Sequence, residues 1–329
     1  HLPGAHFSHT ICVPFPPGSP SSQWNGERSD VVWYRRHITS EEIRDAGLAD
    51  AGHRPHLLIH FEAVDFASDV WVNGLHLVHH EGGYTPFTVE IDPSDYLDAG
   101  FEIVVRAHDR LDAGDQPRGK QDWQEHPHGI WYHCVVGIWR DVWMEVVPVD
   151  YVRSLTWSWD IEEAQVTCDV ECAGLPAATG SRNAIEASLT LDLAGVTLAA
   201  TMVRARSGQL RLVAQIPALA NRQEWGHLLW SPAHPNLINA RICVGEDEVV
   251  SYVGIRDVNL SHRYLEINHQ PTYLRGILDQ GYWPSSYFTA PSAEALKADL
   301  ELARDMGFNF VRIHERSADR RTLTWADRM

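Results

Sequence analysis

The chain has 329 residues, which at ~150 residues per domain predicts about two domains, or three small ones. Apolar residues make up 44% and charged residues 22%, a balance that excludes a disordered or collagen-like chain. The formal charge of −17 makes a polyanion a poor partner, so we expect no nucleic acid to bind. No apolar run approaches the ~20 residues that span a bilayer, so we also expect no membrane partner.

Several common chemistries lack their motifs. The five cysteines form no C-x-x-C pair, so neither a zinc ribbon nor a disulfide scaffold is predicted. The sequence has no G-x-S-x-G elbow, phosphate-binding loop or G-x-G-x-x-G motif. We therefore expect no serine nucleophile and no cofactor.

Both ends predict an excerpt of a longer chain. The sequence begins at His1 without an initiator Met or a signal peptide, and it stops at Met329 directly after a helix-like stretch. One sequon, Asn259-Leu260-Ser261, would suit a secreted protein, but such triplets often arise by chance. The compartment is left open.

Residues 1–148 predict a β-sandwich. Residues 31–38, 57–61 and 101–107 are rich in aromatic and β-branched side chains, and residues 138–147 alternate as a half-buried strand does. Asn73-Gly74 predicts a hairpin turn, because both residues tolerate a positive φ. Only the segment from Ser40 to Ala49 has a helical pattern. Many short strands between Gly and Pro turns favour a jelly roll.

Residues 149–257 predict a second, smaller sandwich. Segments with strand patterns recur at residues 185–193, 196–203, 208–216, 238–244 and 248–255. About seven strands in ~105 residues fit an immunoglobulin-like domain. No residue in this region suggests a functional site.

Residues 258–329 predict the start of a parallel α/β domain. Residues 272–278 have the pattern of a strand, Ser292 can cap a helix that runs to about Met306, and residues 308–313 return to strand. Strand, helix and strand form a βαβ unit, whose sheet needs cover on both faces. One such unit cannot bury itself, so we expect further repeats beyond Met329.

Two clusters in the first region suggest chemistry. His126-x-His128 resembles the histidine pair of a cupin, but the next acidic residue is Asp141, so the spacing fails and no metal site is predicted. Thirteen tryptophans make sugar stacking a second possibility. Trp33, Trp71, Trp139 and Trp143 lie in strand patterns and are expected to fill the core, whereas Trp123 and Trp131 lie in an irregular stretch where they could meet a sugar.

The strand ends of the βαβ unit give the third candidate, because the carboxyl ends of barrel strands carry function. Asp279 and Gln280 follow the first strand, and Arg312 and His314 lie at the end of the second. An arginine there can orient a carboxylate, and a histidine can donate to a hydroxyl. The alternative is that Arg312 and Glu315 form only a structural ion pair.

The order of motifs resembles the glycoside hydrolases of family 2, which include β-galactosidases, β-glucuronidases and β-mannosidases. The first region carries residues 13–17 (VPFPP), 33–36 (WYRR), 61–65 (FEAVD), 70–74 (VWVNG), 82–87 (GGYTPF), 117–121 (PRGKQ) and 137–143 (GIWRDVW). The second carries residues 230–237 (WSPAHPNL) and 254–256 (GIR). The third carries residues 274–284 (LRGILDQGYWP), 307–314 (GFNFVRIH) and 325–328 (WADR).

The resemblance implies a jelly-roll sugar-binding domain at 1–148, an immunoglobulin-like domain at 149–257 and the opening of a TIM barrel at 258–329. It implies the N-terminal region of a retaining exo-β-glycosidase, with a terminal β-linked sugar as substrate, and it allows a homo-oligomer. The first domain departs from the family by lacking its usual N-terminal strand region.

The family uses two glutamates, one as acid/base and one as nucleophile. None of this chain's glutamates matches the Asn-Glu acid/base motif. We therefore expect the chain to hold no catalytic residue and to be inactive alone. The resemblance gives Arg312 a supporting role in the active site, and His314 lies near, but not at, the position of a family histidine. Substrate contacts are expected at Arg312, His314, Asp279, Gln280 and Trp123.

Two other functions stay open from the sequence. If the chain ended at Met329, a non-catalytic carbohydrate-binding or assembly module would explain it better, because a partial barrel exposes an unpaired strand edge. A cupin-like metal enzyme would require metal bound through His126 and His128.

Overall fold

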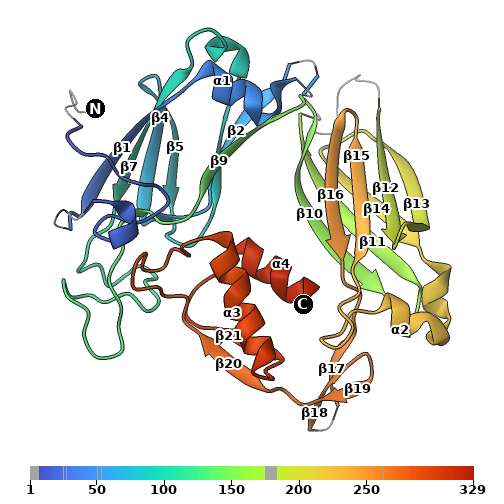
Figure 1. Cartoon of the computed structure of the whole chain (residues 1–329). Helices are drawn as coiled ribbons and strands as arrows, with labels where there is room; N and C mark the ends of the chain where they lie inside the picture. The colour runs from blue at the N-terminus through green and yellow to red at the C-terminus, as the bar shows by residue number, and fades with distance from the viewer. Residues whose placement is uncertain are drawn as a thin grey trace. The chain divides into compact units, whose positions relative to one another are not determined.

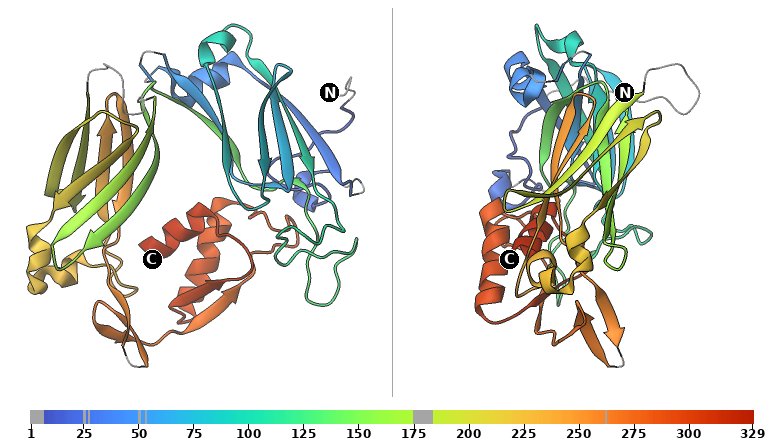
Figure 2. Two further views of the ribbon diagram at one scale, coloured as in Figure 1. Left: turned by 180° about the vertical axis from the view of Figure 1, so that it is seen from behind. Right: turned by 90° about the vertical axis from the view of Figure 1, so that its right-hand side faces the viewer.

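The computed structural model describes residues 7–24, 26, 28–49, 51–52, 54–174, 184–261 and 263–329. It is mainly β, as the sequence predicts, and it divides into two compact units (Figures 1 and 2). The first unit holds residues 1–49, 56–146 and 276–322, and the second holds residues 50–55, 147–275 and 323–329. The domain boundaries after residues 148 and 257 stay predictions.

The first unit contains two main antiparallel sheets. Their strand orders are β1-β7-β4-β5 and β6-β2-β9, and a short β3-β8 pair accompanies them. The strands are β1 (Val31–Ile38), β2 (His56–Phe61), β3 (Val64–Asp65), β4 (Ala67–Val72), β5 (Leu75–Glu81), β6 (Phe87–Ile91), β7 (Phe101–His108), β8 (Gly137–Ile138) and β9 (Val142–Val147). Apolar residues such as Phe61, Val89 and Phe101 are almost fully buried. This pattern of inward apolar residues is typical of a β-sandwich.

Local signals in this unit are confirmed. Asn73 and Gly74 have φ values of 45° and 83°, and they join β4 to β5 with Val72 opposite Leu75. Helix α1 (Ser40–Ile43), which continues as a wider helical turn to Leu48, begins at a capping box in which Thr39 and Glu42 exchange hydrogen bonds. The strand predicted at residues 138–147 is interrupted, because residues 139–141 lie between β8 and β9.

The tryptophans differ from the expectation that four of them fill the core. Trp139 is 2% exposed, but Trp143 is 41% exposed. Trp33 and Trp71 are half-buried and stack with their ring centroids 5.5 Å apart. Alternation along a strand decides which face a residue occupies, and an aromatic side chain on the outer face can still cover the sheet by stacking.

Gly100 provides a test of this packing. Its φ is +69°, and a Cβ at this position would collide with the carbonyl oxygen of Ile38. We expect Gly100→Ala to lower the free energy of unfolding by about 3 kcal/mol, because backbone strain and overpacking add. Gly195→Ala is the matched control, since Gly195 has a φ of +80° but no atom within 4 Å of the added carbon. If urea unfolding showed the same decrease in the free energy of unfolding for both variants, this prediction would be contradicted.

The second unit is also a β-sandwich. Its sheets have the orders β10-β11-β14 and β13-β12-β15-β16, and its core draws on both of them. The seven strands are β10 (Tyr151–Asp160), β11 (Gln165–Ala173), β12 (Ile185–Leu193), β13 (Val196–Ala205), β14 (Gln209–Gln215), β15 (Ile238–Val244) and β16 (Asp247–Val253), and α2 (Trp225–Leu228) lies between β14 and β15. A small sheet of β17 (Val258–Ser261), β18 (Tyr264–Ile267) and β19 (Gln270–Thr272) follows.

The predicted βαβ unit is present. Strands β20 (Gly276–Asp279) and β21 (Phe310–Ile313) pair in parallel, α3 (Ala293–Asp305) connects them, and α4 (Arg320–Arg328) follows. Ser292 caps α3 by accepting a hydrogen bond from the backbone N–H of Ala295. The strand predicted at 272–278 starts later, because Thr272 already belongs to β19.

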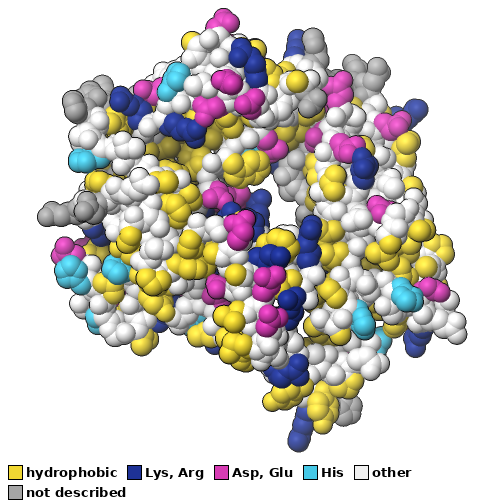
Figure 3. Space-filling view, in the orientation of Figure 1, with side chains coloured by type: hydrophobic (Ala, Val, Ile, Leu, Met, Phe, Trp, Pro, Cys, Tyr) yellow, Lys and Arg dark blue, Asp and Glu magenta, His cyan; other side chains and the backbone are white. Residues whose placement is uncertain are grey.

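The described helices and the surface add two observations. None of the helices is long and apolar enough to cross a membrane. On the face shown in Figure 3, basic and acidic side chains are interspersed around α3. That face therefore offers no continuous basic surface.

Candidate active site at the strand ends

The carboxyl ends of β20 and β21 lie side by side. Asp279 ends β20 and pairs in register with Ile313 of β21. The backbone N–H of His314 then donates to the Asp279 carbonyl oxygen at 3.0 Å, which extends the pairing by one step. Parallel pairing thus brings together residues that are more than 30 positions apart in the sequence.

An ion pair fixes the Asp279 side chain. One carboxylate oxygen accepts a hydrogen bond from the Gly281 N–H at 2.7 Å, and the other lies 2.6 Å from Nη2 of Arg316. The Arg316 side chain is only 7% exposed, and its Nε is buried without a hydrogen-bond partner. Because both carboxylate oxygens are engaged, Asp279 has a positioning role in this arrangement.

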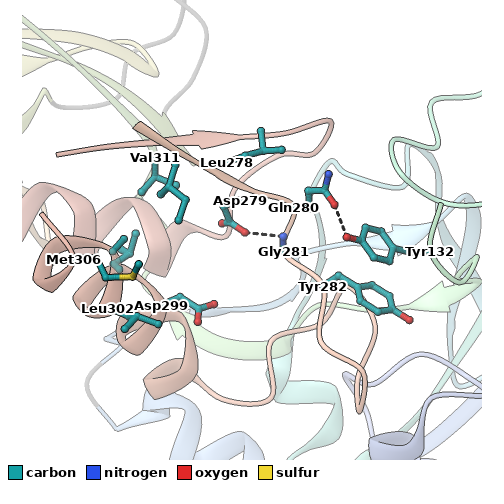
Figure 4. Close-up of a pocket in the computed structure, with 13 residues that line it drawn as sticks. Tyr132, Leu278, Asp279, Gln280, Gly281, Tyr282, Asp299, Leu302, Met306 and Val311 are labelled. Carbon is teal, nitrogen blue, oxygen red and sulfur yellow. Dashed lines mark hydrogen bonds between the residues drawn. The ribbon is translucent and has the colours of Figure 1, made fainter. Parts of the chain in front are cut away.

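A cavity of about 550 Å³ opens beside this strand end (Figure 4). Asp279, Gln280 and Asp299 supply polar groups, and Tyr132 and Tyr282 supply aromatic rings. Burial raises the pKa of Asp299, and the nearby Asp279 carboxylate raises it further. The apolar lining of the cavity comes from both strands and α3, namely Ile277, Leu278, Leu300, Leu302, Ala303, Met306 and Val311.

Arg312 does not line this cavity. Its partner in register on β20, Leu278, does line the cavity, but Arg312 is not among the lining residues. The Arg312 side chain is exposed and makes no hydrogen bond or ion pair with any residue that the structure describes. The alternative interpretation, in which Arg312 and Glu315 form a structural ion pair, is therefore wrong.

Glu315 pairs instead with His314, whose Nε2 lies 3.3 Å from the Glu315 carboxylate. His314 is 19% exposed and likewise does not line the cavity. The five predicted contact residues thus fall into two groups, with Asp279 and Gln280 at the cavity and the others away from it.

A long loop of the first unit, residues 109–136, reaches these strand ends. The Tyr132 hydroxyl donates to Oε1 of Gln280 (Figure 4), and its ring stacks on Tyr282 with centroids 4.2 Å apart. The backbone of Gly119 lies so close to the Glu315 carbonyl that a Cβ could not fit between them. The loop therefore contacts the ends of both strands.

Buried polar groups hold this loop in shape. Arg118 donates to the carbonyl oxygens of Leu111, Ala113 and Asp122. Asp122 is fully buried and accepts from the backbone N–H groups of Gln124 and His128 and from the His128 ring. Despite the desolvation that opposes it, these hydrogen bonds lower the pKa of Asp122. A loop with so many internal bonds can present a fixed surface.

Trp123 projects from this loop and is 48% exposed. Its ring meets Trp131 edge to face at 5.2 Å and His128 at 5.1 Å. His128 is thus engaged by Asp122 and Trp123. Within the described residues, no group of three or more His, Cys, Asp or Glu side chains is placed to hold a metal ion.

Sequence analysis missed several residues of this site. Tyr282 donates to or accepts from Nδ1 of His133 at 2.6 Å, and burial raises the pKa of Tyr282 to about 12. Burial, followed by the charge of His126, lowers the pKa of His133. A local signal did exist for Tyr282 and Arg316, since each follows a strand end within three residues. Nothing in the sequence marked Tyr132 or Asp299.

The comparisons with known proteins find similarity to proteins named as β-galactosidases and β-glucuronidases. No family model matches the chain. The β-galactosidase of Thermoanaerobacter pseudethanolicus is 27% identical over 294 residues, which cover 86% of this chain and 36% of that protein. The chain spans about a third of the length of the first curated relatives it matches.

Solved structures show the same fold. A β-glucuronidase from Lactobacillus rhamnosus superposes with a TM-score of 0.71 at 21% identity, over 99% of this chain and 52% of that one. A glycosyl hydrolase family 2 member from Bacteroides cellulosilyticus gives a TM-score of 0.66 at 18% identity, over 98% of this chain and 42% of that one. Sequence and fold thus agree with the resemblance.

Proposed function

The chain is related to the N-terminal region of the glycoside hydrolases of family 2, and from this relationship we propose that the whole protein is a retaining exo-β-glycosidase that removes a terminal β-linked sugar. The observation that carries the proposal is the similarity to named β-glycosidases over most of this chain. These names favour hydrolysis over a non-catalytic binding module.

In this proposal the described residues bind and position, and the two catalytic carboxylates come from outside this chain. Arg312 is a free guanidinium on β21, available to orient a carboxylate or a sugar hydroxyl. Gln280 holds the loop of residues 109–136 through Tyr132, and Asp279 fixes Arg316 at the strand end. Trp123 offers an aromatic face to a sugar ring. His314 has a weaker claim, because Glu315 already engages it.

Two measurements test the proposal. The 329-residue chain should release no nitrophenol from chromogenic β-galactosides, β-glucuronides or β-mannosides, because it lacks the carboxylate pair. The whole protein should hydrolyse at least one of them, and NMR should show the β-anomer forming first. Turnover by the 329-residue chain would contradict the assignment of the carboxylates. Initial release of the α-anomer by the whole protein would contradict a retaining mechanism.

A further inference from the structure

His133 belongs to the loop formed by residues 109–136, and it contacts the segment that follows β20. Its imidazole ring stacks on the Tyr287 ring, with the centroids 4.3 Å apart and the planes at 7° to each other. Its Nδ1 lies 2.6 Å from the hydroxyl oxygen of Tyr282. Both tyrosines come shortly after Asp279, the last residue of β20. His133 therefore joins the loop to the segment that leaves the strand end.

The Tyr282 hydroxyl donates this hydrogen bond, and the His133 ring accepts it. Burial, followed by Tyr287, raises the pKa of Tyr282 to about 12, against a hydrogen bond from the backbone N–H of His133 that lowers it. The phenol therefore keeps its proton. Because its oxygen already accepts from the His133 backbone, its O–H is left to donate to Nδ1. A ring that accepts at Nδ1 is the neutral imidazole with its proton on Nε2.

The groups that face His133 favour this neutral form. Burial, followed by the charge of His126 on the same loop, lowers the pKa of His133 from its ordinary value of 6.5. The segment after β20 packs the uncharged phenols of Tyr282 and Tyr287 against the ring. No carboxylate in the described part of the chain pairs with it. A protonated ring could not accept from Tyr282, and it would place a charge among these side chains.

Tyr282 connects this contact to the residues at the strand end. Its ring stacks on the Tyr132 ring, and the Tyr132 hydroxyl donates to Gln280 (Figure 4). Between Gln280 and Tyr282, the backbone N–H of Gly281 donates to the Asp279 carboxylate at 2.7 Å. Because Gln280 lines the cavity, a displacement of Tyr282 would disturb a predicted substrate contact.

We propose that His133 is a positioning residue of the glycosidase. Its neutral ring holds Tyr282 by accepting the hydroxyl hydrogen bond, and Tyr282 keeps Gln280 in place for the substrate. Protonation of the ring releases Tyr282, so substrate positioning weakens at acidic pH. This role rests on the proposed function, and it adds a pH dependence that does not come from the two catalytic carboxylates.

NMR titration of the 329-residue chain tests the contact itself, with the His133 signals assigned from their loss in His133→Asn. We expect the proton of the neutral ring on Nε2 and a pKa below 6.5. Tyr282→Phe removes the hydroxyl and keeps the aromatic ring, so it should raise the pKa of His133 toward its ordinary value. A His133 pKa at or above 6.5, or one that Tyr282→Phe leaves unchanged, would overturn the proposal.

Turnover by the whole protein tests the positioning role. His133→Phe keeps a ring but offers no acceptor, so kcat/KM for the cleaved β-glycoside should fall about tenfold at pH 8. His133→Asn puts a carbonyl oxygen near the position of Nδ1 without a titrating proton. It should retain most of kcat/KM at pH 8 and lose less of it than the wild type between pH 8 and pH 5.5. His37→Phe is the matched control, because it makes the same change at an exposed histidine of β1.

The variants also separate positioning from folding. If His133→Phe unfolds, Tyr282→Phe breaks the same hydrogen bond from the other side and should cause the same loss of kcat/KM at pH 8. Wild-type kcat/KM in the Phe variants, or a wild-type pH profile in His133→Asn, would overturn the positioning role.

The positioning role and the glycosidase function fail differently. If the whole protein hydrolyses a β-glycoside and the His133 variants match the wild type at every pH, the function is retained and the positioning role is lost. If the NMR titration gives the expected result but the whole protein hydrolyses no β-glycoside, the function is lost and only the contact between His133 and Tyr282 is retained.

Discussion

Asp65→Asn is expected to remove a large part of the pH dependence of the protein's stability. Asp65 is 2% exposed and accepts a hydrogen bond from Nε2 of Gln121 at 2.7 Å. Burial and, after it, the nearby Asp109 carboxylate together raise the pKa of Asp65 from 3.8 to about 7, against the lowering effect of the Gln121 hydrogen bond. The folded protein therefore holds a proton on Asp65 that the unfolded chain releases at lower pH.

The direction of the effect follows from proton linkage. Between the unfolded pKa of 3.8 and the folded pKa of about 7, the folded state binds more protons than the unfolded state. The free energy of unfolding consequently falls as the pH rises through this window, by on the order of 4 kcal/mol for this group. Below the window the contribution is fully present, and above it the contribution is lost.

Asparagine keeps the acceptor for Gln121 but carries no titrating proton. Urea unfolding at pH 4 and pH 8 should show that Asp65→Asn loses less stability than the wild type across this interval. Asp112→Asn is the control, since its side chain is 80% exposed. If the free energy of unfolding changes by the same amount between pH 4 and pH 8 in Asp65→Asn and in the wild type, Asp65 is ionised in the folded state throughout this interval.

The Asp65 contact also supports the loop formed by residues 109–136. Gln121 donates to Asp65 and accepts from the backbone N–H of Val135, so it ties the middle and the C-terminal end of the irregular stretch to β3. Lys120 and Asp122 flank Gln121 in the chain. A stable Asp65–Gln121 contact therefore helps hold this loop beside β3.

Features set by neighbours in the sequence were predictable. Asn73-Gly74 forms its hairpin because two adjacent residues tolerate positive φ, and Ser292 starts α3 because its side chain accepts from the third residue along. The two β-sandwiches followed from strand-like patterns and turns. Each of these signals lies within a few residues of the structure that it determines.

Features set by distant contacts were not predictable from local patterns. Tyr132 meets Gln280 across 148 positions, and Arg140 donates to the Ser317 carbonyl across 177. The core assignment of Trp143 was wrong, because the break at residues 139–141 separates β8 from β9 and Trp143 lies on the exposed face of β9. The family resemblance identified the strand ends, but it could not identify which loop meets them.

Arg312→Ala in the whole protein is the prediction that most directly tests the proposed active site. The Arg312 side chain is exposed on β21, and none of the described residues bonds to it, so its removal should change the free energy of unfolding by less than about 0.5 kcal/mol. If it orients substrate or a catalytic carboxylate, kcat/KM for the cleaved β-glycoside should fall about 100-fold, equivalent to about 3 kcal/mol of transition-state stabilisation.

Two further variants serve as comparisons for Arg312→Ala. Arg312→Lys keeps the charge but loses the planar pair of donors. If kcat/KM of Arg312→Lys lies between those of Arg312→Ala and the wild type, the charge alone contributes. If it is as low as that of Arg312→Ala, a bidentate contact is required. Arg316→Met breaks a largely buried ion pair with Asp279 and should lower both stability and turnover. A loss of activity in Arg312→Ala with an unchanged urea midpoint therefore separates a direct role from a structural one. Unchanged kcat/KM in Arg312→Ala would remove Arg312 from the active site.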